Sequence, residues 1–313
     1  MKPLPSVHQR ESPIGLLYGV CAYGFWGIVP LYFRALQHVS ALELLAQRIT
    51  WSTILLAGVL SVNRRWGDIR RCLLVPRTRS ILVLSTLLIA ANWYCYIWAA
   101  THGQVVQASL GYFIAPLCSA ALGVFILRER LRRLQLMALA LATGGVVVLA
   151  IQAGAIPWIA LVLAGSFSLY GLLRKTVAAD ALIGLAIESL LLTPASLSYL
   201  IWLQLEGAAA FGRVDRATDL LLAAAGVVTV IPLFCFAKAA RRLRLTTIGF
   251  LQYLSPTGQF LLAVTVLREP FDAHKLYGFL PTWIALGLYS FDTMSAYRQP
   301  RPSAEPVSCD KPD

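Results

Sequence analysis

The chain has 313 residues, of which 58% are hydrophobic and only 13% are charged, with a net charge of +12 and a mean hydropathy of +0.68. A soluble protein of this length needs far more charge to cover its surface, so the composition excludes a soluble globular protein. Apolar runs recur along the whole sequence, each long enough to cross a bilayer core of roughly 30 Å. An all-α polytopic membrane protein is predicted.

A polar tail at residues 1–12 precedes the first apolar run, which is too long for the hydrophobic part of a signal peptide and lacks a cleavage site. A second polar, proline-rich tail at residues 297–313 is predicted to be disordered. Between the tails the hydropathy pattern predicts ten transmembrane helices, at 13–33, 41–62, 80–100, 105–127, 134–151, 156–173, 181–203, 219–237, 246–267 and 274–294.

Most of the 27 lysines and arginines fall in the segments that would share one side of the membrane with the N-terminus. Cytoplasmic loops carry an excess of such residues, so both termini are predicted to be cytoplasmic. The positive charge is therefore a topology signal and does not indicate a nucleic-acid partner. Contact of the basic loops with anionic lipids is compatible with the same pattern.

The stretch 109–129 is written a second time at 249–269, with every position shifted by 140 residues. Pro116 falls on Pro256, and Leu127-Arg128-Glu129 falls on Leu267-Arg268-Glu269. We interpret this as an internal duplication that divides the chain into repeats at 13–151 and 156–294. Because each repeat has five spans, an odd number, the second enters the membrane inverted, which is a common build of secondary transporters.

Two prolines lie near the middle of equivalent spans, the fourth and the ninth. Pro116 and Pro256 each remove one helical hydrogen bond, which frees the carbonyls of Tyr112 and Gln252. Free backbone carbonyls at membrane depth are tolerated only where they face protein or a water-filled cavity. The prolines are therefore predicted to be helix kinks beside a cavity, and kinks that serve packing alone are the alternative.

Ionisable residues within spans are expensive and are often functional. Arg48 in the second span is a candidate anion contact, and Glu188 in the seventh is a candidate carboxylate for coupling to protons or cations. A purely structural pairing with hydroxyl or backbone neighbours is equally compatible with each of them. Glu43 lies close to a span end, where snorkelling to the interface accounts for it, and Lys238 closes its span in the same way.

Polar and aromatic side chains that lie deep within spans are candidate cavity residues. Asn92 and Tyr96 are four apart and share one face of the third span, and Trp93 is adjacent. The full predicted substrate cavity comprises Asn92, Trp93, Tyr96, Tyr112, Gln252 and Tyr253.

Motifs for enzyme chemistry, nucleotide binding or metal ligation are missing from the sequence, and the six cysteines form no CxxC pair. No cofactor, no metal and no enzymatic activity are expected. Any transport would have to use a gradient and not ATP.

Several blocks of the sequence resemble the RarD family of EamA-type transporters, within the drug/metabolite transporter superfamily. The resemblance covers about residues 13–293 and rests on Asn92-Trp93, the block Ala-Ser-Leu-Gly-Tyr-Phe-Ile at 108–114, Pro116-Leu117, Tyr170-Gly171-Leu172 before Arg174-Lys175, the block Arg-Leu-Arg-Leu-Thr at 242–246, and Gln252-Tyr253 before Pro256-Thr257. Lys238 departs from the small or polar residue expected at its position.

The resemblance implies two inverted five-helix repeats, a bacterial inner-membrane location, and a permease role for small metabolites or drugs. Alternating access to a cavity between the repeats is the expected mechanism, with the lipid bilayer, a small molecule and protons as partners. A lipid flippase and a non-transporting receptor or assembly subunit are the alternatives. The sequence does not define the oligomeric state.

Overall fold

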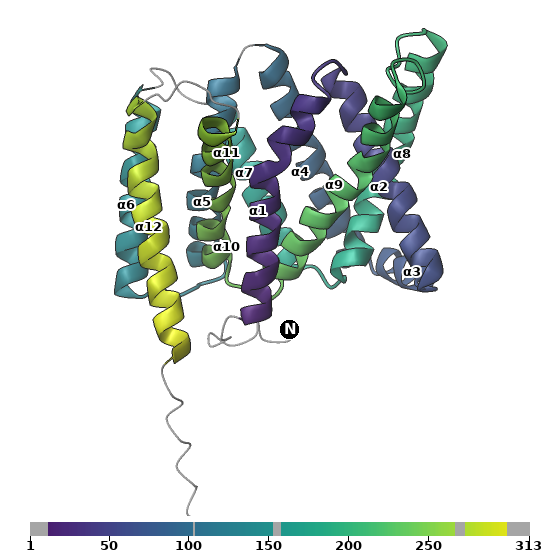
Figure 1. Ribbon diagram of the computed structural model, residues 1–313. Helices are drawn as coiled ribbons and strands as arrows, with labels where there is room; N and C mark the ends of the chain where they lie inside the picture. The colour runs from purple at the N-terminus through teal and green to yellow at the C-terminus, as the bar shows by residue number, and fades with distance from the viewer. Residues whose placement is uncertain (1–11, 103, 153–157, 267–272, 299–313) are drawn as a thin grey trace, which may run out of the picture.

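The computed structural model describes residues 12–102, 104–152, 158–266 and 273–298, and within these ranges it is helical with no strand. The helices are α1 (Pro13–Ala35), α2 (Ala41–Val62), α3 (Trp66–Leu74), α4 (Pro76–Thr101), α5 (Val105–Phe125), α6 (Arg133–Gln152), α7 (Trp158–Thr176), α8 (Ala181–Leu205), α9 (Arg216–Ala240), α10 (Leu245–Gln252), α11 (Leu254–Thr265) and α12 (Ala273–Arg298). Figure 1 shows the long helices standing side by side in one bundle.

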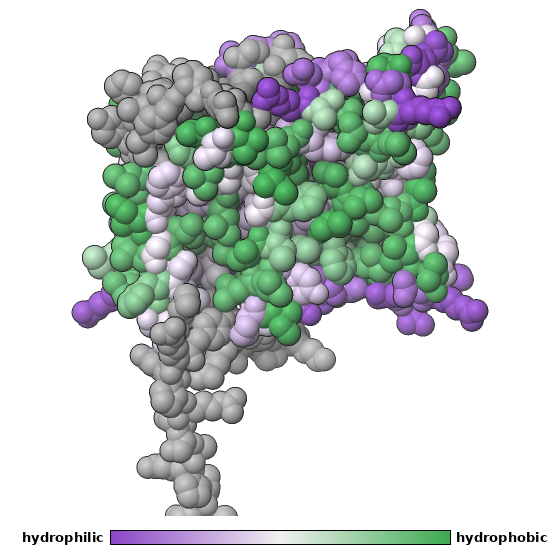
Figure 2. Space-filling model, viewed as in Figure 1, coloured by the Kyte–Doolittle hydropathy of each residue, from purple (hydrophilic) through white to green (hydrophobic). Residues whose placement is uncertain are grey.

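The surface of this bundle is that of a membrane protein. Figure 2 shows a broad hydrophobic belt between two hydrophilic rims, one at each end of the helices. Within the described residues, α1, α2, α4, α8 and α9 are long and apolar enough to cross a membrane, and shorter apolar stretches lie in α5 and α6. An apolar exterior is stable only in lipid, which agrees with the predicted all-α polytopic membrane protein.

We call the end where α1 begins the N-terminal face (bottom in Figure 1), and the end where α1 finishes the opposite face.

Side-chain caps mark several helix starts: Ser12, Ser40 and Asp215 accept hydrogen bonds from the backbone amides of Gly15, Glu43 and Thr218. Such caps satisfy amides that have no partner within the helix.

Two local features differ from the predicted spans. A short helix, α3, lies in the segment predicted to be a loop between the second and third spans; it follows Arg64, which has a positive φ of 52°, and buries Ile69. The predicted ninth span is broken at Tyr253 into α10 and α11. Pro256 is therefore in the first turn of α11, whereas Pro116 lies inside the continuous helix α5.

Glycines let some helices approach closely. A β-carbon on Gly27 of α1 would lie 3.2 Å from the Cα of Gly258 in α11, and one on Gly249 of α10 would lie 2.6 Å from the backbone oxygen of Pro116 in α5. Such small-residue contacts are typical of helix packing in membranes. They bring α1 onto α11 and α5 onto α10, and these four helices frame the site described next.

Candidate functional site

A cavity of about 730 Å³ lies among helices from both halves of the chain. Its walls come from α1, α2, α4, α5, α7, α9, α10 and α11. Arg34 and Gln37, both exposed near the end of α1, mark its mouth at the opposite face. Clefts of this size between helices are typical small-molecule sites.

Five of the six predicted cavity residues line this cavity: Asn92, Trp93, Tyr96, Tyr112 and Gln252. The rings of Tyr96 on α4 and Tyr112 on α5 meet edge to face, with their centroids 6.3 Å apart. Both side chains are partly exposed, so they present their rings to the cavity and to each other.

Tyr253 does not line the cavity. It is the residue at which α10 gives way to α11, and its side chain is buried beside Phe250 while its hydroxyl donates to the backbone oxygen of Phe113 at 3.4 Å. A continuous helix would keep neighbouring side chains in fixed register, but the break redirects the chain here. Gln252 faces the cavity and Tyr253 packs behind it.

Side-chain amides in the cavity walls already form hydrogen bonds with other residues of the protein. The Asn92 side-chain nitrogen donates to the backbone oxygen of Leu163 and to the Ser166 hydroxyl, both at 2.9 Å, and ties α4 to α7. The Gln252 side-chain oxygen accepts from the Ser119 hydroxyl at 3.3 Å. Buried amides are expected to be paired in this way.

Pro30, which the sequence patterns did not single out, also lines the cavity. A proline inside α1 frees the carbonyl four residues earlier, that of Trp26. The side-chain nitrogen of Gln259 on α11 donates to this oxygen at 3.2 Å. The proline thus creates an acceptor, and a polar residue from the other half of the chain satisfies it.

Arg48 lies in the cavity wall, on α2. Its Nε donates to the Thr229 hydroxyl on α9 at 3.0 Å, and its guanidinium carbon lies 5.2 Å from the Trp93 ring centroid and 5.7 Å from that of Phe33. No carboxylate pairs with it in the part of the chain that the structure describes. Thr229 and Phe33 are lining residues that sequence patterns alone did not reveal, because both are ordinary residues of apolar spans.

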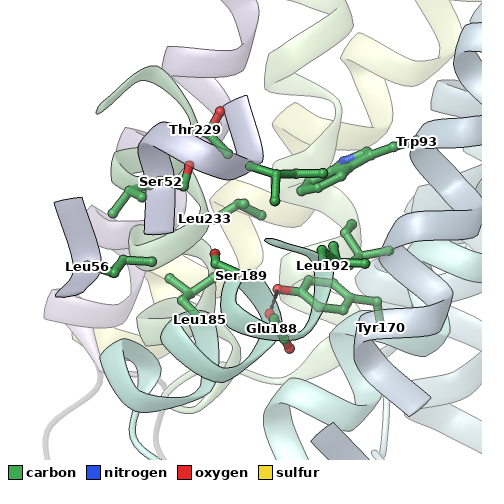
Figure 3. Close-up of a pocket in the computed structure, with 13 residues that line it drawn as sticks. Ser52, Leu56, Trp93, Tyr170, Leu185, Glu188, Ser189, Leu192, Thr229 and Leu233 are labelled. Atoms are coloured by element: carbon green, nitrogen blue, oxygen red, sulfur yellow. Dashed lines mark hydrogen bonds between the residues drawn. The ribbon is translucent and has the colours of Figure 1, made fainter. Parts of the chain in front are cut away.

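A second, much smaller cavity of about 20 Å³ lies below the first, toward the N-terminal face. Ile89, Trp93, Thr229 and Leu233 line both cavities, so they form the partition between them. Figure 3 shows Trp93 and Thr229 at one end of this pocket and Glu188 with Tyr170 at the other. The space is sufficient for about one water molecule.

Glu188 is 4% exposed and fully engaged by neighbours. Its carboxylate accepts from the Ser85 hydroxyl at 2.6 Å and the Tyr170 hydroxyl at 3.1 Å, and pairs with the Arg174 guanidinium at 3.4 Å. Arg174 is itself 1% exposed and also donates to the backbone oxygen of Ala181. The predicted sixth span ends at 173 and so leaves Arg174 outside it, whereas α7 continues to Thr176 and buries this side chain.

Two predicted charged residues have different surroundings from those expected. Glu43 is 2% exposed, and its carboxylate accepts from the backbone amides of Ala210 and Phe211, so it fixes the connection between α8 and α9 and does not snorkel. Lys238 pairs with Asp180 at 3.3 Å. Asp180 also pairs with Arg65 at 3.1 Å, so one carboxylate links the α2–α3 turn, α8 and α9 at the N-terminal face.

The described residues contain no group of three or more His, Cys, Asp or Glu side chains able to hold a metal ion. The polar and aromatic groups of the two cavities are two arginines, a buried carboxylate, side-chain amides, hydroxyls and aromatic rings.

Comparisons with known proteins show the family of this chain. Residues 13–151 match the model of the EamA-like transporter family. The chain is 43% identical to an uncharacterized transporter of Vibrio cholerae over 92% of this chain and 95% of that protein, and 42% identical to protein RarD of Escherichia coli over 93% and 98%. One solved crystal structure has the same fold at 17% identity, with a TM-score of 0.69 over 90% of this chain and 98% of the other. The chain therefore belongs to the RarD family of EamA-type transporters.

Proposed function

We propose that this chain is a secondary transporter that carries a small molecule across the bacterial inner membrane by alternating access. The observation that carries the proposal is the large cavity, which reaches the opposite face at Arg34 and is closed toward the N-terminal face. Two sets of contacts form the closure: the buried Arg174–Glu188 pair and the surface pairs of Asp180. A transporter needs such a state, open on one side only.

Ten membrane crossings in two inverted repeats, at 13–151 and 156–294, are part of the proposal. Two contacts support it. The Thr53 and Thr193 hydroxyls lie 2.7 Å apart, and the Tyr253 hydroxyl donates to the Phe113 backbone oxygen; both pairs are separated by 140 positions. That separation equals the offset of the duplicated stretch, and equivalent residues of two repeats can touch only close to a two-fold axis.

The orientation follows from charge. Arginines and lysines gather at the N-terminal face, among them Arg65, Lys238 and Arg241. By the positive-inside rule this face is cytoplasmic, so both termini are cytoplasmic and the cavity opens outward. The state described is then the outward-open one.

Glu188 is proposed as the group through which protons act on this closure. A proton that enters the large cavity would reach Glu188 through the small cavity, which has room for one water beside Trp93 and Thr229. Protonation would remove the charge that holds Arg174, and so weaken the closure at the N-terminal face. Release of the proton would restore it.

The test is solute flux in proteoliposomes, with and without a proton gradient, for the wild type and Glu188→Gln. Gradient-driven flux that Glu188→Gln uncouples supports the proposal, and Glu206→Gln, at an exposed glutamate outside both cavities, is the matched control for the same change of charge. Gradient-independent flux in the wild type would indicate a uniporter, and Glu188 would then have no role in coupling. Flux of labelled lipid alone would favour the flippase, and no flux of any kind the receptor or assembly subunit.

A further inference from the structure

We infer that the substrate is an organic monoanion, a carboxylate carried on a flat apolar body. The inference rests on the proposed function and names the substrate class of the same cavity. Its starting point is the charge of the walls: Arg34 and Arg48 are the charged side chains that line the cavity, and no aspartate or glutamate is among the described lining residues.

Arg48 is arranged to bind an anion. One of its donors, Nε, is held by Thr229, which fixes the plane of the guanidinium. Its terminal nitrogens hydrogen-bond to no residue in the described ranges. A planar guanidinium with free terminal N–H groups matches a carboxylate through two parallel hydrogen bonds.

Two side-chain amides of the walls already donate to other groups of the protein. The side-chain nitrogen of Asn92 donates to α7, and that of Gln259 donates to the Trp26 carbonyl and to Ser255. These groups are occupied by the protein itself. Arg48 is therefore the strongest donor left for a substrate, and it is the one for which an anion is the natural partner.

Aromatic rings provide the rest of the site. The walls include Tyr23, Trp26, Phe33, Trp93, Tyr96, Tyr112 and Phe167. Rings of this kind pack face or edge against flat apolar groups and give orientation as well as buried area. A substrate that combines a planar apolar body with one carboxylate would use both the rings and Arg48.

The sign and number of charges in the cavity walls exclude other classes of substrate. An ammonium group, in an amine or an amino acid, would find no carboxylate in the described walls. A dianion would leave one charge uncompensated beside the single deep arginine. A monoanion neutralises Arg48, and a neutral pair is the arrangement that best tolerates the low dielectric of the membrane interior.

The experiment measures binding to the full-length protein in lipid nanodiscs, by calorimetry, for four probes with one phenyl body. These are 3-phenylpropionate, 3-phenylpropanamide, 3-phenylpropylamine and phenylalanine. We expect 3-phenylpropionate to bind most tightly, and Arg48→Gln to weaken it at least about tenfold while the amide is unchanged. Arg48→Lys should retain part of the preference, and Arg213→Gln, at an exposed arginine outside the cavity lining, should leave it unchanged.

Failure to bind 3-phenylpropionate at millimolar concentration, equal binding of the four probes, or a preference for the amine would each overturn the inference. If Arg48→Gln does not fold, the ranking of the probes in the wild type and in Arg48→Lys decides. Binding does not require transport, so the two proposals can fail separately. Carboxylate binding without flux would refute the transporter, whereas flux of amines or amides that ignores Arg48 would refute the substrate class alone.

Discussion

Arg174 on α7 and Glu188 on α8 form an ion pair of 3.4 Å in which both side chains are almost completely buried. Ser85 and Tyr170 donate to the same carboxylate, so three helices meet at one negative charge. The Arg174 Nε is buried and has no hydrogen-bond partner among the described residues, which is costly for a charged group. In the proposed transporter, this charge pair lies at the closed end of the cavity and would be broken and remade in each cycle.

The first prediction concerns the energy of this pair. Arg174→Ala leaves Glu188 buried without its counter-ion and should lower the free energy of unfolding by about 3–5 kcal/mol. The double variant Arg174→Met/Glu188→Leu replaces the pair with apolar groups and should restore most of the loss. Denaturant unfolding in detergent measures both, and a single variant as stable as the wild type would contradict a structural pair.

Gly184 tests the same pair by steric means. A β-carbon on Gly184 would lie 1.8 Å from the Arg174 Nη1 atom, so Gly184→Ala must displace the guanidinium from Glu188. We expect a loss of stability of roughly 2 kcal/mol or more. Gly165→Ala is the matched control, since nothing lies within 4 Å of its added carbon and alanine favours helix. Equal melting temperatures for the two variants would show that the guanidinium relocates freely.

The sequence predicted the membrane class and the positions of most of the long helices, because long apolar stretches form helices in a bilayer. It did not predict the break at Tyr253, although Pro256 was identified, because a proline permits either a kink inside a helix or a new first turn. The helix α3 was not predicted, because its arginines lower the hydropathy of the segment to that of a loop.

The candidate site was predictable only in part. Asn92, Trp93 and Tyr112 stand out as polar or aromatic residues deep in spans, and they line the cavity. Arg174 could not be found in this way, because an Arg-Lys pair at the end of a span is the usual mark of a cytoplasmic edge. Its partner lies 14 positions away on another helix, and only the tertiary packing brings the two together.

Asp180 offers a prediction on pH. Burial raises the pKa of this carboxyl. Hydrogen bonds from Arg65 and from the Ala181 amide, together with the charge of Lys238, lower the pKa by more than burial raises it, so the net shift is downward. The contribution of Asp180 to stability is therefore present above the ordinary carboxyl pKa of about 3.9 and is lost as the pH falls through the lower folded-state value.

Asp180→Asn should accordingly reduce stability slightly at pH 7, by under about 1 kcal/mol because the pairs are partly exposed, and this difference should shrink as the pH falls below the ordinary carboxyl pKa of about 3.9. Thermal unfolding of both proteins across this range checks the expectation. Glu206→Gln, an exposed carboxylate outside the ion pairs of the described residues, is the control. A difference that does not shrink as the pH falls would assign the effect of Asp180 to packing.

The Thr53–Thr193 contact predicts where the two proposed repeats pivot. Residues on a two-fold axis move least when one repeat rocks against the other, so this contact should persist through transport. Thr53→Cys/Thr193→Cys, in a background lacking the native cysteines, should cross-link under mild oxidation and keep substantial flux. Each single variant controls for oxidation of one thiol. A cross-link that stops flux completely would show that α2 and α8 must separate.

The break between α10 and α11 yields the last prediction. Pro256 has no N–H to donate to the Gln252 carbonyl, whereas an alanine at the same position has one. Pro256→Ala should therefore favour one continuous helix and turn Gln252 out of the cavity. Flux should fall several-fold with little loss of stability. Pro116→Ala is the matched control, since α5 is already continuous and should change little. Because the two prolines are equivalent in the proposed repeats but differ in their helices, equal losses of flux would mean that the proline itself matters and the break does not.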